Sequence, residues 1–417
     1  MADEVWITGI GLISSLGEGA DAHWQALTAA DPRPVLAASA VPPYAIHPLC
    51  AVDLDRQIPR KGDQRQMEPW QRLGTYAAGL ALDDAGVARN PDLLARTDMI
   101  VAAGGGERDV AVDAAVTKAM ADAPDDATAG RVLNERLSND LRPTLFLAQL
   151  SNLMAGNISI VHGVVGSSRT FMGEELAGAA AVDVAARRIL AGQGVLALAG
   201  GAFSAARTDL ILTYEIGSAL SRAPWVPVWQ RGGAGAGFIM GSLGAFLVLE
   251  AAGHARARGA RGIARLTATA TEDSGRAPGA AAAAAWRMWN GMEGLAPLNG
   301  SSGAPLGVLS GATGAAPALA EETRFLDALA AERPISVRGT GSLLGHGVEA
   351  QFAANIALAA LAISRSANSG GAFYPPLDGG RFERSAAGAV RDILVTGFGV
   401  WRGEALALVS PIEENGA

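Results

Sequence analysis

The chain has 417 residues, of which 49% are hydrophobic and 18% are charged, and its formal net charge is −8. This length and composition predict a large buried core in a two-domain or duplicated protein. The negative charge argues against nucleic acid or an anionic membrane as a partner. No run of 18 apolar residues occurs, so no membrane span is expected. The single cysteine excludes a disulfide framework, and the first residues lack a secretory signal pattern, so we expect a cytoplasmic protein.

Apolar segments typical of buried strands alternate with helical patterns along the chain, which favours an α/β fold. The predicted strands are residues 5–10, 98–103, 157–161, 195–199, 245–250, 262–270, 307–310, 335–337 and 393–396. The predicted helices are residues 68–85, 174–191, 321–331 and 348–363. Two further segments are interpreted as a charged helical insertion, at 109–141, and as a helix start or mobile lid, at 280–289.

Residues 170–178, Thr-Phe-Met-Gly-Glu-Glu-Leu-Ala-Gly, are the most informative stretch of the chain. A strand-like run at 156–161 precedes them and an Ala-rich helical run at 176–192 follows, so the sequence predicts an elbow between a strand and a buried helix. Backbone N–H groups and the helix dipole favour negative charge at a helix N-terminus. Enzymes place a nucleophile at such an elbow. Here the elbow residue is Glu175, with Glu174 beside it.

Six sequence blocks, spread over nearly the whole chain, carry a family resemblance. They lie at residues 5–17, 60–71, 152–160, 199–201, 247–260 and 397–399, the last being Gly-Phe-Gly. In content and order they resemble the β-ketoacyl-acyl carrier protein synthases, or ketosynthases, of the condensing-enzyme family. The resemblance implies a thiolase-like, five-layered αβαβα fold made of two duplicated βαβ-rich halves, residues 1–252 and 253–417. It also implies that the insertion at 109–141 lies over the acyl tunnel and the dimer contact.

The resemblance also gives positions to the three catalytic groups of a ketosynthase. Such an enzyme uses a Cys that carries the acyl chain as a thioester, and two His that support decarboxylation and stabilise the oxyanion. The matching positions in this chain are Glu175 for the Cys, Gly311 or Ala312 for the first His, and Ser342 for the second. We therefore expect no catalytic residue at these positions. His346, four residues after Ser342, is the substitute imidazole that the sequence offers.

Glu175 is a poor acyl acceptor, because a carboxylate would form an anhydride, which is far more labile than a thioester. A general-base role would need a pKa raised by burial, whereas the helix N-terminus lowers the pKa. We therefore expect Glu175 to fill the cavity and to accept hydrogen bonds from elbow N–H groups. Cys50 lies in a Pro-rich segment without an elbow and is interpreted as a free thiol. No histidine has metal-ligand spacing, so neither a metal nor a cofactor is expected.

The first functional hypothesis is a non-catalytic ketosynthase-like subunit of the chain-length-factor type. It would pair as a heterodimer with an active ketosynthase in the synthesis of long-chain fatty acids, envelope lipids, polyenes or polyketides. The second is an active acyltransferase or decarboxylase of the same family that uses Glu175 with His346. The third is a homodimeric acyl-binding scaffold. An acyl carrier protein is an expected partner, and basic clusters at residues 56–65 and 187–188 are candidate docking sites.

Condensing enzymes dimerise through the strand beside the elbow, so the first hypothesis places this region at the neighbour's acyl tunnel. Phe171 and Met172 are the apolar residues best placed to limit acyl length. Val400 and Trp401 add bulk where the family leaves room for the malonyl arm. The tunnel and interface candidates are Arg169, Phe171, Met172, Glu174, Glu175, Phe398, Val400 and Trp401.

Overall fold

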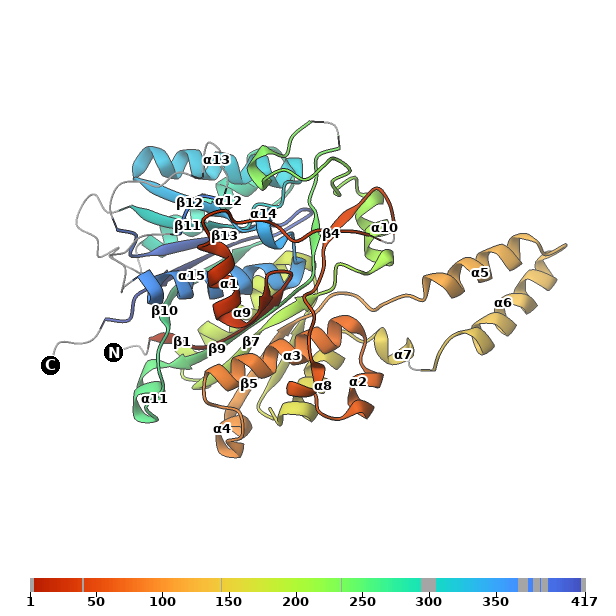
Figure 1. Cartoon of the computed structure of the whole chain (residues 1–417), viewed down its shortest axis with the longest axis horizontal. Helices are drawn as coiled ribbons and strands as arrows, with labels where there is room; N and C mark the ends of the chain where they lie inside the picture. Colours follow the sequence, from red (N-terminus) through yellow and green to blue (C-terminus); the bar gives the residue numbers. More distant parts are fainter. Residues whose placement is uncertain are drawn as a thin grey trace.

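The structure is a computed structural model that describes residues 4–39, 41–143, 145–233, 235–293, 305–366, 374–377, 383 and 389–413. Most strands in this part of the chain form one 11-stranded sheet, which divides into two halves (Figure 1). In spatial order, the first half contains β6 (Ser168–Phe171), β5 (Thr97–Ala102), β7 (Leu196–Phe203), β9 (Leu243–Ala251) and β1 (Val5–Ser14). β6, β5 and β7 are parallel, whereas β9 and β1 are antiparallel to their neighbours.

The second half repeats this plan. In the same spatial order it contains β12 (Ile335–Gly339), β11 (Leu306–Ser310), β13 (Ile393–Phe398), β14 (Glu404–Ser410) and β10 (Ala264–Glu272). β12, β11 and β13 are parallel, and β14 and β10 are antiparallel to their neighbours. The halves meet where β1 pairs with β10, Val5 opposite Leu266 and Ile7 opposite Ala264. The topology therefore displays a duplication that is not visible as similarity within the sequence.

Helices complete five layers (Figure 1). α9 (Glu174–Leu190) follows β6, α15 (Gln351–Ser366) follows β12, and these two helices pack on each other between the halves of the sheet. The outer layers are formed by α3 (Pro69–Asp84) and α8 (Leu153–His162) over the first half, and by α12 (Ala280–Glu293) and α13 (Ala316–Glu332) over the second. This αβαβα order agrees with the fold that the sequence implied.

Small side chains allow the central helices to pack closely. In α9, the buried residues Ala177, Ala181 and Ala185 recur every four positions and share one face. Ala353 and Ala357 do the same in α15, and all five belong to the largest hydrophobic core. Alanine also has the best helix propensity, so the Ala-rich runs seen in the sequence both form helices and fit the crowded middle layer.

One predicted strand is wrong. Residues 157–161 lie in α8, not in a strand. The alternation in Ile-Ser-Ile resembles a strand, but Met154, Ala155 and Ile158 are buried at helical spacing against α3. Gly163, with a φ of +75°, ends the helix in the left-handed conformation. The strand that enters the elbow is the short β6, which the sequence analysis did not separate from the turn.

The segment that opens with an Ala run is a helix of the outer layer rather than a lid. In α12, Ala281, Ala285 and Trp289 are buried in a core shared with α13. Trp289 is among the largest fully buried side chains that the structure describes. This helix is therefore fixed by its packing.

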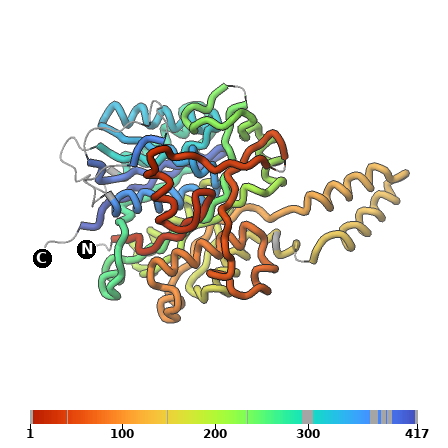
Figure 2. The backbone as a smooth tube through the Cα atoms, viewed as in Figure 1, coloured from red at the N-terminus to blue at the C-terminus, as the bar shows by residue number. Residues whose placement is uncertain are grey.

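The charged insertion forms a helical pair that projects from the body as an arm (Figures 1 and 2). α5 (Val110–Ala121) and α6 (Asp126–Asp140) pack on each other, and the side chains of Asp109 and Asp125 cap their N-termini. Only Val116 of the two helices is buried. The helical prediction for 109–141 is correct, whereas its contact with a tunnel or a second subunit stays a prediction.

The remaining elements are shorter. They are β2 (Gly17–Glu18), α1 (Gly19–Leu27), β3 (Ala37–Ala38), β4 (Ala45–His47), η1 (Leu54–Arg56), α2 (Lys61–Gln66), α4 (Pro91–Arg96), α7 (Leu145–Ala148), α10 (Thr208–Ile216), η2 (Val228–Gln230), β8 (Met240–Gly241), α11 (Ala252–Ala257), α14 (Gly341–Leu344) and η3 (Val348–Ala350). Among the helices in the described ranges, none is both long and apolar enough to cross a bilayer.

Candidate active site

A strained turn connects β6 to α9 and sets the position of Glu175. Gly173 has a φ of +131° and Glu174 a φ of +51°. A left-handed conformation is uncommon for a residue with a side chain, and it costs about 1 kcal/mol or more. Arg402 stabilises the turn, because its Nε donates a hydrogen bond to Glu174 Oε2 at 3.0 Å. Strain of this kind is concentrated at functional sites.

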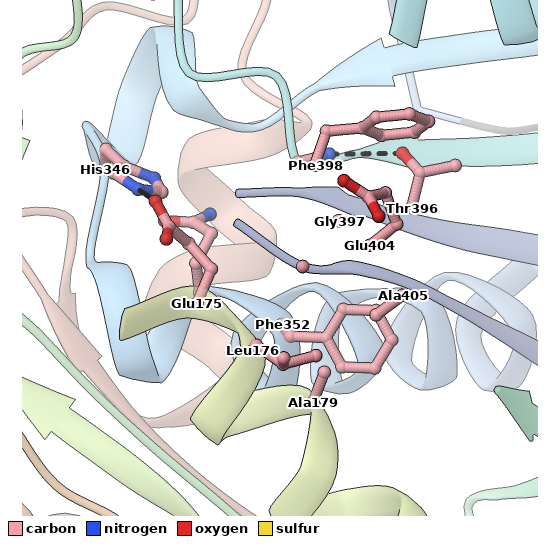
Figure 3. A pocket seen from close by; sticks show the side chains of 13 residues that line it. Glu175, Leu176, Ala179, His346, Phe352, Thr396, Gly397, Phe398, Glu404 and Ala405 are labelled. Carbon is pink, nitrogen blue, oxygen red and sulfur yellow. Dashed lines mark hydrogen bonds and ion pairs between the residues drawn. The ribbon is translucent and has the colours of Figure 1, made fainter. Parts of the chain in front are cut away.

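The Glu175 carboxylate forms a close pair with His346. The distance from Glu175 Oε1 to His346 Nε2 is 2.7 Å, and the two side chains point toward one another in Figure 3. The backbone N–H of Val400 donates to the same oxygen at 3.3 Å. The Glu175 side chain is 12% exposed and that of His346 is 3% exposed. The substitute imidazole of the sequence analysis therefore lies in contact with the elbow carboxylate.

The surroundings keep Glu175 ionised. Burial alone acts to raise its pKa, but the hydrogen bond and the charge of His346 oppose this, together with its own backbone N–H and that of Val400. The balance holds the pKa of Glu175 below its ordinary value. Its hydrogen-bond donors thus come from three separate segments, whereas the sequence predicted them in the elbow alone.

His346 lies in the turn between β12 and α15, which corresponds in the second half to the elbow between β6 and α9 in the first. β12 leads into α14, and Gly345 with a φ of +69° turns the chain toward η3 and α15. The His346 backbone is anchored on both sides, since its N–H donates to Ile239 O at 2.8 Å and its carbonyl accepts from Gly241 N–H at 2.9 Å. The Phe238 ring packs edge-on against the imidazole at 5.0 Å. The duplicated topology therefore brings the two turns together at one point.

The positions predicted for the two catalytic histidines of the family are taken by small buried residues. A Cβ added at Gly311 would lie 2.6 Å from the carbonyl oxygen of Thr396, so no larger residue fits there without a backbone shift. Its neighbour Ala312 is buried. Ser342 Oγ accepts a hydrogen bond from Val228 N–H at 2.9 Å. Ser342 is fully buried as well, so an imidazole at either position would require the surrounding residues to move.

The cavity beside the Glu175–His346 pair is small. Its volume is about 20 Å³, and its lining includes Gly311. Leu176 and Phe352 also line it (Figure 3). A space of this size holds about one water molecule. It does not hold an acyl thioester.

The tunnel and interface candidates divide into two groups. Val400 is buried, and Trp401 stacks on Tyr214 with ring centroids 4.7 Å apart, close to Glu174 and Glu175. Phe398 is also buried, in the core of the second half. On β6 and just beyond it, by contrast, Arg169 is exposed, Met172 is 61% exposed, and Phe171 is half-buried against the chain's own core.

Sequence reasoning missed Glu349, a second buried carboxyl near the elbow. It is 6% exposed and follows Val348, whose φ of +39° is an outlier for a β-branched residue. Burial raises the pKa of Glu349 to about 7, and the nearby charge of Glu175 acts in the same direction. No pattern in the sequence separates Glu349 from the other acidic residues at helix starts.

Cys50 lies outside this site. It is half-buried in a groove formed with Ile13, Leu73 and Tyr76. Burial, with the charge of Glu18, raises the pKa of the thiol and makes it a weaker nucleophile. Within the described ranges, no group of three His, Cys, Asp or Glu side chains is arranged to hold a metal ion.

Known proteins provide an independent comparison. Residues 2–255 match the family model of the beta-ketoacyl synthase N-terminal domain. The 3-oxoacyl-[acyl-carrier-protein] synthase 2 of Rhizobium meliloti (strain 1021) is 28% identical over 278 residues, which are 62% of this chain and 61% of that protein. The synthase 2 of Vibrio cholerae (serotype O1, strain ATCC 39315 / El Tor Inaba N16961) is 25% identical over 266 residues, 62% of this chain and 60% of that protein. The matches thus span about three fifths of these relatives.

Solved structures match the whole chain. The ishigamide ketosynthase/chain length factor has a TM-score of 0.77 at 19% identity, with 99% of this chain and 100% of that chain covered. A beta-ketoacyl synthase from Burkholderia phymatum STM815 has a TM-score of 0.78 at 19% identity and the same coverage. These likenesses define the class of the fold, the thiolase-like fold of condensing enzymes. Since the family model matches more than half of the chain, the protein belongs to the β-ketoacyl synthase family.

Proposed function

We propose that the chain is a non-catalytic ketosynthase-like subunit of the chain-length-factor type. In the cytoplasm it pairs with an active ketosynthase and shapes the length of a long fatty acyl, polyene or polyketide product. The observation that carries this proposal is the state of the elbow. An ionised carboxylate, held by His346 and Val400, lies at the position that the family resemblance assigns to the acyl-accepting Cys, with space for about one water beside it.

The solved neighbours support a role in a complex. One is a ketosynthase/chain length factor, and another is a type II polyketide acyl-carrier protein in complex with its ketosynthase. The latter structure has a TM-score of 0.73 at 16% identity, with 99% of this chain and 100% of that chain covered. We extend both kinds of partner, a ketosynthase and an acyl carrier protein, to this chain.

The outer edge of β6 supports pairing with a second subunit. Among the described strands, only β5 pairs with β6. Apolar side chains lie exposed around this edge: Met172 is 61% exposed, Val165 65% and Ile160 69%. An unpaired edge next to apolar surface is a common place for another chain to dock. Met172 is therefore the better candidate for reaching a neighbour's tunnel, because Phe171 packs against its own core.

The carrier protein has a cleft available on the second half. Most residues of the basic clusters are neutralised, since Arg56, Lys61, Arg187 and Arg188 form ion pairs with Glu18, Asp55, Asp183 and Asp98 respectively. A cleft of about 360 Å³ lies between Arg276, Arg324, Phe398 and Trp401. Its two arginines are also paired, with Glu404 and Glu321, so the cleft is a candidate because of its size and not because of free positive charge. Its volume is in the range of small-molecule sites. We propose that the prosthetic arm of the carrier enters here.

Co-expression with an active Cys-His-His ketosynthase of the same organism tests the pairing. We expect a one-to-one heterodimer in size-exclusion chromatography with light scattering, and products whose length differs from those of the ketosynthase alone. The double variant Ile160→Asp/Val165→Asp should weaken the pair at least tenfold, because it puts charge on a surface that the pair buries. The matched control is Val35→Asp, a 46% exposed residue between α1 and β3. A tight homodimer with unchanged product length would instead support the homodimeric scaffold.

The contact between Glu175 and His346 favours a second candidate, an enzyme with altered chemistry. The pair contains a carboxylate and an imidazole 2.7 Å apart, the arrangement in which a carboxylate orients a histidine base. Incubation with acyl- and malonyl-carrier proteins, followed by intact mass measurement and assay of released CO₂, separates the two candidates. A covalent adduct or CO₂ release that depends on His346 would favour the enzyme.

Glu175→Cys alone is expected not to restore condensation. A thiol at the elbow would have one imidazole at most, and Gly311 cannot accept the second without a backbone shift. Loss of groups that act as a unit costs several orders of magnitude, so we expect a rate at least ~10³-fold below that of an active ketosynthase. Mass spectrometry of the carrier-bound product measures this, with Glu175→Gln as the control. Condensation well above that control would contradict the non-catalytic assignment.

A further inference from the structure

A second cavity lies on another side of the elbow. Its volume is about 90 Å³, and it is enclosed by the segments after β5 and β7, by α10 and by the turns that precede the two central helices. Its lining residues include Gly104, Glu174, Arg207, Tyr214, Glu349 and Trp401. The space holds several water molecules or a small ligand group. It is separate from the smaller cavity that Glu175 and His346 line.

Glu349 is the unusual residue of this cavity. Its side chain is almost fully buried, and among the described residues only its own backbone N–H hydrogen-bonds to the carboxylate. Oε1 lies against the backbone of Gly104, since a Cβ added there would be 2.7 Å away. The strained φ of Val348 holds the residue in this place. A buried carboxylate without a counter-ion is costly, and burial raises the pKa of Glu349 to about 7, so a cation in the cavity would take the place of the proton that otherwise neutralises it.

The other charges around the cavity are already compensated. Arg207 donates to both carboxylate oxygens of Asp209, the closer at 2.6 Å, and to the carbonyl oxygens of Gly105 and Gly106. Glu174 is paired with Arg402 at 3.0 Å. Among the charged side chains that line the cavity, Glu349 is therefore the one that no oppositely charged group contacts.

We propose that this cavity binds a primary ammonium group. An ammonium group supplies one positive charge and three N–H donors to the Glu349 carboxylate. Tyr214 and Trp401, which stack on each other, form an aromatic wall that is also favourable for a cation. The ammonium belongs either to a small free amine or to the end of an acyl chain that enters the cavity. The inference goes beyond the proposed pairing and does not depend on it.

The affinity for an ammonium group depends on the charge of Glu349. Burial raises its pKa to about 7, Glu175 and Glu174 on α9 act in the same direction, and Arg207 before α10 opposes them. Tyr214 faces the carboxyl from α10 and stays neutral, because burial raises its pKa further. On the β5 side, Gly104 and Gly105 contribute only backbone atoms to the cavity lining. The imidazole of His346 hydrogen-bonds to Glu175. An alkylammonium titrates near pH ~10, so it stays charged while Glu349 ionises.

Calorimetric titration of the isolated chain with n-propylammonium tests the proposal, with n-propanol and propionate as neutral and anionic controls. We expect binding of the ammonium alone, about tenfold tighter at pH 8.5 than at pH 6, because the ionised fraction of a carboxyl with a pKa near 7 rises by that factor. Glu349→Gln should weaken binding at least tenfold. The matched variant Glu215→Gln lies beside Tyr214 on α10 but outside the cavity lining, and it removes a carboxylate that is paired with Arg222, so it should change affinity less than threefold.

A pantetheine amide of 6-aminohexanoate, compared with one of hexanoate, distinguishes the two sources. Tighter binding of the amino-ended chain than of n-propylammonium assigns the site to an acyl end, and the reverse order assigns it to a free amine. The proposal is overturned if neither amine binds, if propanol binds as well as propylammonium, or if Glu349→Gln retains the affinity while circular dichroism shows it folded. Because the isolated chain is used, none of these outcomes depends on whether a ketosynthase pairs with it.

Discussion

Replacing His346 by Ala is expected to lower the free energy of unfolding by about 3 kcal/mol, because it leaves a buried carboxylate without its partner. The Glu175 side chain has little access to water, and His346 is the largest of the groups that keep its pKa low. In His346→Ala, the hydrogen-bond donors that remain for the Glu175 carboxylate are the backbone N–H groups of Val400 and of Glu175 itself. Urea unfolding at pH 7 measures the loss as a shift of the midpoint at constant slope.

A second Glu–His pair in the chain is the matched control. His254 Nδ1 lies 2.6 Å from Glu250 Oε1, but Glu250 also keeps the Arg258 guanidinium, whose Nε and Nη2 donate at 2.7 and 2.6 Å. His254→Ala should therefore cost only about 1 kcal/mol. His346→Gln, which retains an N–H donor, should recover part of the loss. If His346→Ala costs no more than His254→Ala, the Glu175 carboxylate does not depend on its imidazole.

Between pH 5 and pH 8, ionisation of Glu349 and Glu322 is expected to lower the free energy of unfolding by several kcal/mol, whereas the buried His23, His47 and His162, whose pKa values burial lowers, act in the opposite direction below pH ~6.5. Burial raises the pKa of both Glu349 and Glu322 from 4.5 to about 7, although hydrogen bonds from Ser310 and Thr396 oppose the shift at Glu322. The folded state therefore holds these protons more tightly than the unfolded state. The stability is complete below the unfolded value and is lost as pH rises through the folded one. Each group contributes on the order of 3 kcal/mol.

Glu349→Gln is expected to remove the contribution of about 3 kcal/mol that Glu349 itself makes to this pH dependence, and to make the protein more stable than the wild type at pH 8. Glu175 does not offset this change in stability between pH 5 and pH 8. Its pKa is lowered, so the stability that it contributes is lost only at lower pH. Chemical unfolding at several pH values gives the slope, and Glu135→Gln on the exposed face of α6 is the control. An unchanged slope in Glu349→Gln would show that this carboxyl ionises in the fold as easily as in water.

Much of the fold could be predicted because buried strands are short, apolar and bounded by turn residues. The predicted strands at 5–10, 98–103 and 195–199 lie within or almost within the observed β1, β5 and β7. The failure at 157–161 has a physical reason, since periodicity cannot distinguish a strand from a buried helix over so short an apolar run, and only contacts with α3 decide between them. β6 was missed because its polar Ser168 and Arg169 are at an exposed edge.

The site was predicted in part for a similar reason. Spacing along one segment located Glu175 at the start of α9. The contact with His346 spans 171 positions in sequence and depends on how two turns are folded against each other, which no local pattern records. The crowding at Gly311 and the isolation of Glu349 depend on backbone atoms of distant elements, the carbonyl of Thr396 and the chain at Gly104.

The duplicated plan of the sheet has a consequence for the residues at its centre. The turn before α9 and the turn before α15 are related by an approximate internal twofold symmetry, and each contributes one side chain to the same contact. Identical acids facing each other across such an axis would repel, and so would two charged imidazoles. Glu175 opposite His346 replaces that repulsion by attraction, so divergence between the two repeats is itself what allows their central turns to touch.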